Sequence, residues 1–252
     1  MKIHRFIDNF DLSQKELELS GDIAHQIIKV LKLKIGEKLE LGDGKVTIAF
    51  GEIKEIGKKN VIVKIINVKK EDSNSKKVSL FCAVLKKENF ELVVQKTTEV
   101  GVSKIVPIIS ARTIKTGLNL ERLQKIAKEA SEQSGRISIP EILEPISFEK
   151  SLELCKRDEM NILFDGSGKE SLLEKHCAGR RPEHSNSSAD EYARFSNNDS
   201  LYNIFIGPEG GWTEEEIKKA RGADFKIMNL GNLTLRGETA AIISSYLAVN
   251  LK

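Results

Sequence analysis

Residues 202–216 read YNIFIGPEGGWTEEE, which is an apolar run, a glycine-rich turn and the start of a helix. The apolar run over 202–206 is typical of a buried strand. The three glycines let the backbone approach a ligand closely or adopt positive φ angles. Thr213, followed three residues later by Glu216, predicts a capping box at the helix start. Strand, turn and helix in this order indicate an α/β fold.

The same alternation of strands and helices continues through the rest of the C-terminal part of the chain. Apolar runs predict strands over 78–85, 104–109, 160–164, 202–206 and 225–230. Helical periodicity and glycine stops predict helices over 89–100, about 120–135, 213–220 and 238–249. This order predicts a mostly parallel sheet. The last helix is apolar on all sides, so we expect it to be buried.

The N-terminal part reads differently. Short Val- and Ile-rich runs predict strands over 37–41, 45–55 and 60–68, with one helix over about 22–31. We therefore expect two domains, a small β-barrel over residues 1–72 and an α/β domain over residues 73–252. Residues 176–200 are rich in Ser, Asn, Asp and Arg, and we interpret them as a polar insertion in the second domain.

Charge and composition exclude several classes of protein. The 252 residues carry 40 Lys and Arg against 37 Asp and Glu, a formal charge of +3, so any affinity for nucleic acid must come from local patches. One basic region includes Lys29, Lys32, Lys34 and Lys38, and another runs over 54–77. These lysines are either a solvated sheet edge or a surface that faces phosphates.

Other patterns indicate a cytoplasmic protein. No apolar run approaches the roughly 20 residues of a membrane span, and the N-terminus lacks the apolar stretch of a secretory signal. The three cysteines are scattered, and neither Cys-x-x-Cys nor His-x-x-x-His spacing occurs. We therefore expect no disulfide framework, no membrane association and no metal.

A second glycine-containing turn follows the strand over 225–230, and residues 230–240 read LGNLTLRGETA. Turns at the carboxyl ends of parallel strands face one crevice, where ligands bind in open α/β sheets. Residues 165–168, which read DGSG, form a third turn at a strand end and can line the same crevice. Alternatively, these are only tight turns. Arg236 could stabilise an anion that develops on a substrate. Glu238 could accept hydrogen bonds, act as a base, or simply complement the helix dipole.

Six segments, taken in order, carry a resemblance to a known family. They are Arg5-Phe6, HQIIKVLK over 25–32, QKTTEVGV over 95–102, EQSGR over 132–136 with Pro140, GPEGG over 207–211 and LRGETA over 235–240. Together they resemble the SPOUT-class methyltransferases, and specifically the RsmE family. Members of that family methylate N3 of a uridine in the decoding region of bacterial 16S rRNA.

The resemblance implies a PUA-like barrel followed by a SPOUT α/β domain with a C-terminal trefoil knot. It also implies S-adenosyl-L-methionine as cofactor, a homodimer, and 16S rRNA within the small ribosomal subunit as partner. The cofactor loops of the family correspond to Gly207, Glu209, Gly210, Gly211, Leu230, Gly231, Leu235 and Thr239. We expect catalytic roles for Arg236 and Glu238. We expect RNA contacts from Arg5 and Arg136, together with Lys29 and Lys32 of the basic region.

The last loop departs from the family pattern at three positions. Asn232 stands where the family usually has proline, Leu233 where it has its first arginine, and Gly237 where it has its first threonine. Two alternatives therefore stay open. One is an RNA-binding or ribosome-assembly factor with weakened chemistry, and the other is a SPOUT methyltransferase with another RNA target.

Overall fold

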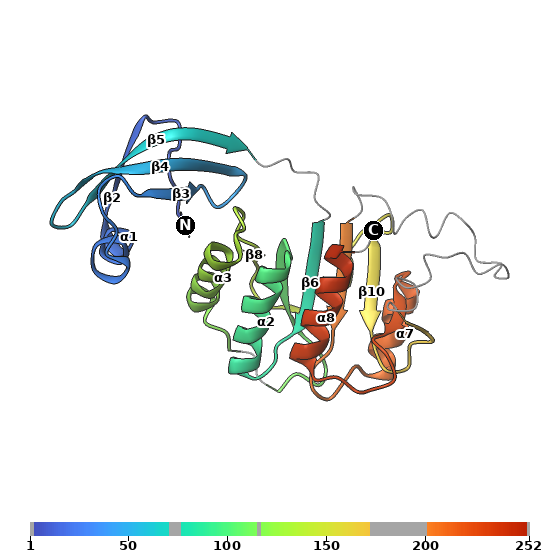
Figure 1. Ribbon diagram of the computed structural model, residues 1–252. Coiled ribbons are helices and arrows are strands. Elements are labelled where there is room, and N and C mark those ends of the chain that lie inside the picture. Colours follow the sequence, from blue (N-terminus) through green and yellow to red (C-terminus); the bar gives the residue numbers. More distant parts are fainter. Residues whose placement is uncertain (1–2, 71–76, 115–116, 172–200, 251–252) are drawn as a thin grey trace. The chain divides into compact units, whose positions relative to one another are not determined.

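The computed structural model describes residues 3–70, 77–114, 117–171 and 201–250 (Figure 1). The predicted insertion over 176–200 lies outside these residues. The chain forms two compact units. The first comprises Met1–Ser73 with Lys128–Ile139, and the second comprises Asn74–Ala127 with Pro140–Lys252.

The first unit is built on a five-stranded sheet. In spatial order its strands are β1 (His4–Ile7), β3 (Lys38–Gly42), β4 (Thr47–Ile56), β5 (Val61–Lys70) and β2 (Glu16–Leu19). β1 pairs with β3 in parallel and the other pairs are antiparallel. The three predicted strands correspond to β3, β4 and β5. β1 and β2 were not predicted, because four residues are too few for an alternating pattern to stand out.

The helix predicted over about 22–31 has two parts. α1 (Gly21–His25) continues as a π-helix over Gln26–Leu31, and the chain leaves it at Lys32 with φ of 53°. Ile27 is fully buried in the core of this unit. Apolar spacing predicts that a helix exists, but it does not distinguish a π-turn from an α-turn.

Residues 128–139 pack with the first unit, although the sequence placed them in the second domain. The Ile7 N–H donates to Glu132 Oε1 at 2.8 Å, and Lys128 Nζ lies 2.9 Å from Asp8 Oδ2. The Ile139 N–H donates to the Gly44 carbonyl at 3.0 Å. These partners lie far apart in the sequence, so local patterns carry no sign of them.

The second unit contains a sheet of eight strands whose pairs are all parallel, as predicted. In spatial order the strands are β11 (Glu170–Ser171), β13 (Lys226–Asn229), β10 (Met160–Phe164), β12 (Leu201–Ile206), β6 (Lys77–Ala83), β7 (Lys104–Ile109) and β8 (Glu141–Ile142), and β9 (Ile146–Ser147) pairs with β7. The chain thus folds as a small β-sheet unit and a larger α/β unit with a parallel sheet.

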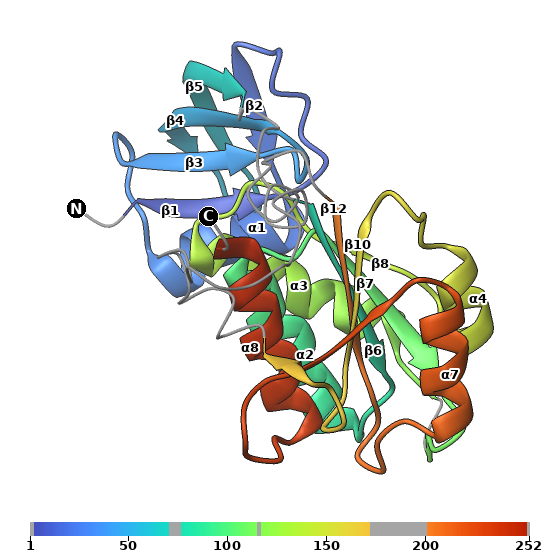
Figure 2. The same cartoon turned by 90° about the vertical axis from the view of Figure 1, so that its right-hand side faces the viewer.

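Helices cover both faces of this sheet. α2 (Lys87–Val100) and α8 (Gly237–Asn250) lie on one face, and α4 (Phe148–Glu153) and α7 (Glu214–Gly222) lie on the other (Figures 1 and 2). Under α4 and α7, Phe205 stacks on Phe81 with 4.4 Å between centroids and meets Phe225 edge-on at 4.9 Å. α3 (Leu120–Ser134) ends before Gly135, as predicted.

α8 is only partly buried, which corrects the expectation for an all-apolar helix. It packs on α2, β6 and β12, and Ala241 and Ala248 are fully buried there. Tyr246, on its outer side, is 55% exposed. The sequence of a uniformly apolar helix therefore does not predict which of its faces is left exposed in the folded chain.

Glu132 gives a test of the packing in the first unit. Burial raises the pKa of Glu132, and the hydrogen bond from Ile7 opposes part of that rise. Because its pKa is raised on folding, Glu132 contributes stability below the ordinary Glu pKa and loses it as the pH rises through the folded pKa. Glu132→Gln keeps an acceptor for Ile7. It should raise the free energy of unfolding at pH 7 by less than about 1 kcal/mol, measured by urea denaturation.

The gain should vanish when the pH falls below the ordinary Glu pKa. Glu121→Gln, an exposed position near the start of the same helix, is the control and should show no pH-dependent gain. A stabilisation of Glu132→Gln that persists at low pH would show that burial of the charge is not its cause.

Candidate active site

Three loops leave the parallel sheet at one edge. Phe164 is paired with both Ile206 and Met228, and Ile206 is paired with Cys82. The carboxyl ends of β10, β12, β13 and β6 are therefore level. The loops over 165–168, 207–213 and 230–236 start at this edge, which is where open α/β sheets bind ligands.

Trp212 anchors the loop over 207–213. Its indole is buried, and Nε1 donates to the Phe164 carbonyl at the end of β10 at 3.1 Å. A β-carbon on Gly207 would lie 3.1 Å from the same indole, so a larger residue there would require the ring to shift by a few tenths of an ångström. The Gly211 N–H donates to the Pro208 carbonyl at 2.8 Å, with φ of 69° at Gly211.

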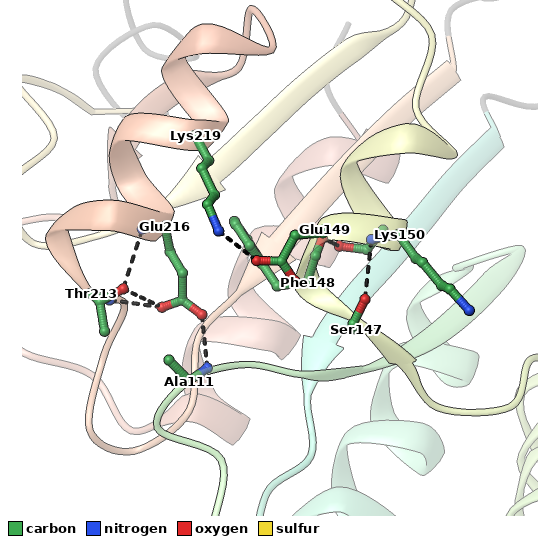
Figure 3. Close-up of polar contacts among 9 residues, drawn as sticks. Ala111, Ser147, Phe148, Glu149, Lys150, Thr213, Glu216 and Lys219 are labelled. Atoms are coloured by element: carbon green, nitrogen blue, oxygen red, sulfur yellow. Dashed lines mark hydrogen bonds and ion pairs between the residues drawn. The ribbon is translucent and has the colours of Figure 1, made fainter.

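The predicted capping box at α7 is present (Figure 3). The buried Glu216 carboxylate accepts from the Thr213 N–H at 2.8 Å, and the Glu216 N–H donates to Thr213 Oγ1 at 3.2 Å. Its second oxygen, Oε1, accepts from the Ala111 N–H at 2.9 Å. Glu216 therefore ties the loop after β7 to the start of α7, which local sequence did not reveal. Lys219 of the same helix pairs with Glu149 of α4 at 2.7 Å (Figure 3).

The loop over 230–236 leads directly into α8. Gly231 has φ of 117°, and its N–H donates to Asn229 Oδ1 at 3.0 Å. Leu233 is 81% exposed. A β-carbon on Gly237 would lie 3.0 Å from Leu85 Cδ2 and 3.6 Å from the Gly207 carbonyl oxygen. The start of α8 thus touches the first glycine-rich loop, and Leu85 occupies space that a threonine side chain at 237 would need.

The two residues expected to be catalytic differ in environment. Arg236 is exposed, and within the described residues its guanidinium has no hydrogen-bond or ion-pair partner. Glu238 is 9% exposed, and its Oε2 has no hydrogen-bond partner in the same part of the chain.

Burial, with the charges of Glu209 and Glu238, raises the pKa of the Cys82 thiol far above its ordinary value. Cys82 is therefore not a thiolate nucleophile.

The remaining cofactor candidates lie on the same loops, except Thr239, which lies in the first turn of α8. Glu209 and Gly210 are exposed, and Glu209 Oε1 accepts weakly from the Lys86 N–H at 3.4 Å. Leu230, Leu235 and Thr239 are half-buried. In the third loop, Asn229 Nδ2 donates to the Gly168 carbonyl at 2.7 Å, which holds residues 165–168 against the end of β13.

The four residues expected to contact RNA all belong to the first unit. Arg5 forms an ion pair with Glu40, with Nε at 2.8 Å from Oε2, and its Nη1 donates to the Arg136 carbonyl at 3.5 Å. Arg136 donates to Ser138 Oγ at 3.3 Å. Lys29 and Lys32 are exposed. Arg5 and Arg136 therefore lie together in a bonded cluster, and the two lysines are open to solvent.

Sequence patterns missed two groups that shape the glycine-rich loop. Trp212 was visible only as part of the motif, and Arg112 had no local signal at all. Arg112 Nη1 donates to the Gly210 carbonyl at 2.7 Å from a different loop.

Among the described residues, no helix is long and apolar enough to cross a membrane. No group of three or more His, Cys, Asp or Glu side chains in that part of the chain could hold a metal ion.

The contribution of the Glu216 hydrogen bonds to stability can be tested by unfolding experiments. Glu216→Ala removes one half of the capping box and leaves the N–H groups of Thr213 and Ala111 without their acceptor, so it should lower the free energy of unfolding by about 2 kcal/mol. The matched control is Glu214→Ala, an exposed position in the same turn, which should change it by less than about 0.5 kcal/mol. Equal losses in the two variants would contradict a specific role for Glu216.

Comparison with known proteins agrees with this architecture. A family model described as an RNA methyltransferase domain matches residues 72–248, and one described as an RNA methyltransferase PUA domain matches residues 19–66.

Full-length relatives extend the match. The chain is 31% identical to ribosomal RNA small subunit methyltransferase E of Rickettsia conorii, covering 96% of this chain and 93% of the relative. It is 26% identical to the protein of that name from Bacillus subtilis, covering 92% and 91%. The crystal structure of the Neisseria gonorrhoeae enzyme of that name, bound to S-adenosylmethionine, is 26% identical with a TM-score of 0.81 over 97% of this chain and 95% of that chain. The chain therefore belongs to the ribosomal RNA small subunit methyltransferase E (RsmE) family and is an RNA methyltransferase.

Proposed function

We propose that this protein transfers the methyl group of S-adenosyl-L-methionine to N3 of a specific uridine in the 16S rRNA of the small ribosomal subunit. The observation that supports it most is the strand register that brings three loops to one sheet edge. The match to a relative with bound S-adenosylmethionine extends over nearly the whole chain.

The residues at this edge fit such a cofactor. Gly207 and Gly237 keep the loops close to each other, and Glu238 Oε2 is a buried acceptor without a partner among the described residues. Buried polar groups normally have partners, so a ligand that donates there would satisfy it. When bound, S-adenosylmethionine supplies an electrophilic methyl group. We assign its binding to Gly207, Glu209, Gly210, Gly211, Leu230, Gly231, Leu235 and Thr239.

Arg236 and Glu238 carry the chemical roles in this proposal. Uracil N3 holds a proton that must leave before or during methyl transfer. The free guanidinium of Arg236, beside the uracil oxygens, favours the resulting anion. Glu238, in the first turn of α8, offers an acceptor for that proton or for a donor that orients the substrates. Alignment of the two substrates supplies much of the remaining acceleration.

Of the four residues expected to contact RNA, Lys29 and Lys32 are the ones we assign to phosphate contacts. Both are exposed, whereas Arg5 is already bound to Glu40. In this proposal, Arg5 and Arg136 act together at the RNA surface through the cluster that joins them. A homodimer in the cytoplasm and a trefoil knot in the second domain stay predictions.

One observation favours a second candidate function. Leu233 is 81% exposed at a position where the family usually has arginine. An RNA-binding or ribosome-assembly factor with weakened chemistry could lack that charge, as could a SPOUT methyltransferase with another RNA target.

Replacement of Arg236 tests the proposed chemistry. Arg236→Ala should lower the rate of methyl transfer to purified small subunits about 100-fold, because the anion loses its charge partner. The dissociation constant for S-adenosylmethionine, measured by calorimetry, should stay within about threefold. Mass spectrometry of digested rRNA locates the methyl group, and Arg236→Lys is the charge-retaining control. Equal losses of turnover and cofactor affinity would assign Arg236 to cofactor binding instead.

The same assays on the wild-type protein distinguish the three candidate functions. Methylation at uridine N3 supports the proposal. Cofactor binding with methylation of another RNA or base atom supports the retargeted enzyme. RNA binding without cofactor binding supports the factor with weakened chemistry.

Salt dependence tests the contribution of the first unit to RNA binding. Lys29→Gln with Lys32→Gln should reduce the slope of log affinity against log salt by about 1.4, if each lysine contacts one phosphate of single-stranded RNA. The matched control is Lys54→Gln with Lys104→Gln, because those lysines already pair with Glu16 and Glu141. Identical slopes in the two double variants would remove Lys29 and Lys32 from the interface.

A further inference from the structure

The loop after β7 forms a rigid turn beside the glycine-rich loop. The Ser110 N–H donates to Thr113 Oγ1 at 2.9 Å, and the two hydroxyl oxygens lie 2.8 Å apart. The Thr113 N–H donates back to the Ser110 carbonyl at 3.1 Å. Glu216 holds the same turn through the Ala111 N–H. The backbone of Arg112 is therefore fixed on both sides.

From this turn the Arg112 side chain reaches two carbonyl groups of the glycine-rich loop. Its Nη1 donates to the Gly210 carbonyl at 2.7 Å and to the Trp212 carbonyl at 3.3 Å. The side chain also fills the space next to Gly210, where a β-carbon would lie 3.4 Å from Arg112 Cδ. The two carbonyls lie on either side of Gly211, whose φ is 69°.

We propose that Arg112 is a positioning residue for the cofactor, because its guanidinium holds the loop over 207–213 in the conformation that binds it. Residues 207–211 include three glycines, so an unrestrained loop has many backbone conformations and loses much entropy on binding. Trp212 fixes the far end of the loop on β10. Arg112 fixes the middle before the ligand arrives, which reduces the ordering cost of binding.

Arginine is suited to this role. A charged donor makes a stronger hydrogen bond to a carbonyl than a neutral donor does. The planar guanidinium also approaches two neighbouring carbonyls from one side. Lysine keeps the charge but lacks the planar group, so Arg112→Lys should recover only part of the effect. The inference rests on the proposed function for its ligand, but the restraint on the loop is a property of the free protein.

Trp212 is the only tryptophan in the chain, so its fluorescence reports on this loop alone. In the full-length protein without ligand, Arg112→Ala should increase acrylamide quenching of Trp212, because the loop opens more often. Calorimetric titration with S-adenosylmethionine should show a dissociation constant raised about tenfold, and Arg112→Lys should fall between Arg112→Ala and wild type. Circular dichroism should show the same secondary structure in all three proteins.

Arg122→Ala is the matched control. Arg122 is an exposed arginine in the same unit, and its guanidinium pairs with Glu91 at 2.6 Å and not with residues 207–213. It should leave both quenching and cofactor affinity unchanged. Unchanged quenching and affinity in folded Arg112→Ala would overturn the inference. If Arg112→Ala does not fold, wild-type quenching and affinity in Arg112→Lys would overturn it. If the wild-type protein does not bind the cofactor, the proposed function fails, and the quenching comparison still decides whether Arg112 restrains the loop.

Discussion

Parallel pairing of β10 with both β12 and β13 is the constraint on which the candidate site depends. It makes Phe164 level with Ile206 on one side and with Met228 on the other. A slip of one residue in either pair would turn buried side chains to the other face of the sheet. Both faces of these strands are packed, so such a slip would take Leu163 of β10 out of the cluster that it forms with Phe205 and Phe225. The core thus holds the three loops at one edge.

Side chains from other elements then shape these loops. Trp212 connects the glycine-rich loop to the end of β10, Glu216 connects the start of α7 to the loop after β7, and Arg112 returns from that loop to Gly210. The glycines allow the tight path, and the three side chains hold its ends and its middle through hydrogen bonds. Such a combination suits a binding loop, because glycines let a ligand approach the backbone, and side chains from other elements supply rigidity.

The first unit combines an ordinary sheet core with an uneven charge distribution. Lys54 pairs with Glu16 at 2.6 Å, whereas Lys29 and Lys32, around the π-helix, have no ion-pair partner among the described residues. Arg5 contributes to the folding of this unit through Glu40 and the Arg136 carbonyl. Arg5, which we expect to contact RNA, therefore also connects two segments of its own unit.

Local patterns were sufficient for the parallel sheet, for the box formed by Thr213 and Glu216, and for the glycine-rich turns after β12 and β13. Each depends on neighbouring residues along the chain, where apolar period, capping residues and glycine act directly on the backbone. The short strands β1 and β2, the transfer of residues 128–139 to the first unit and the contact of Arg112 with Gly210 were not accessible in this way. They join segments far apart in the sequence, and only the packing of the folded chain brings their hydrogen-bonding groups within reach of each other.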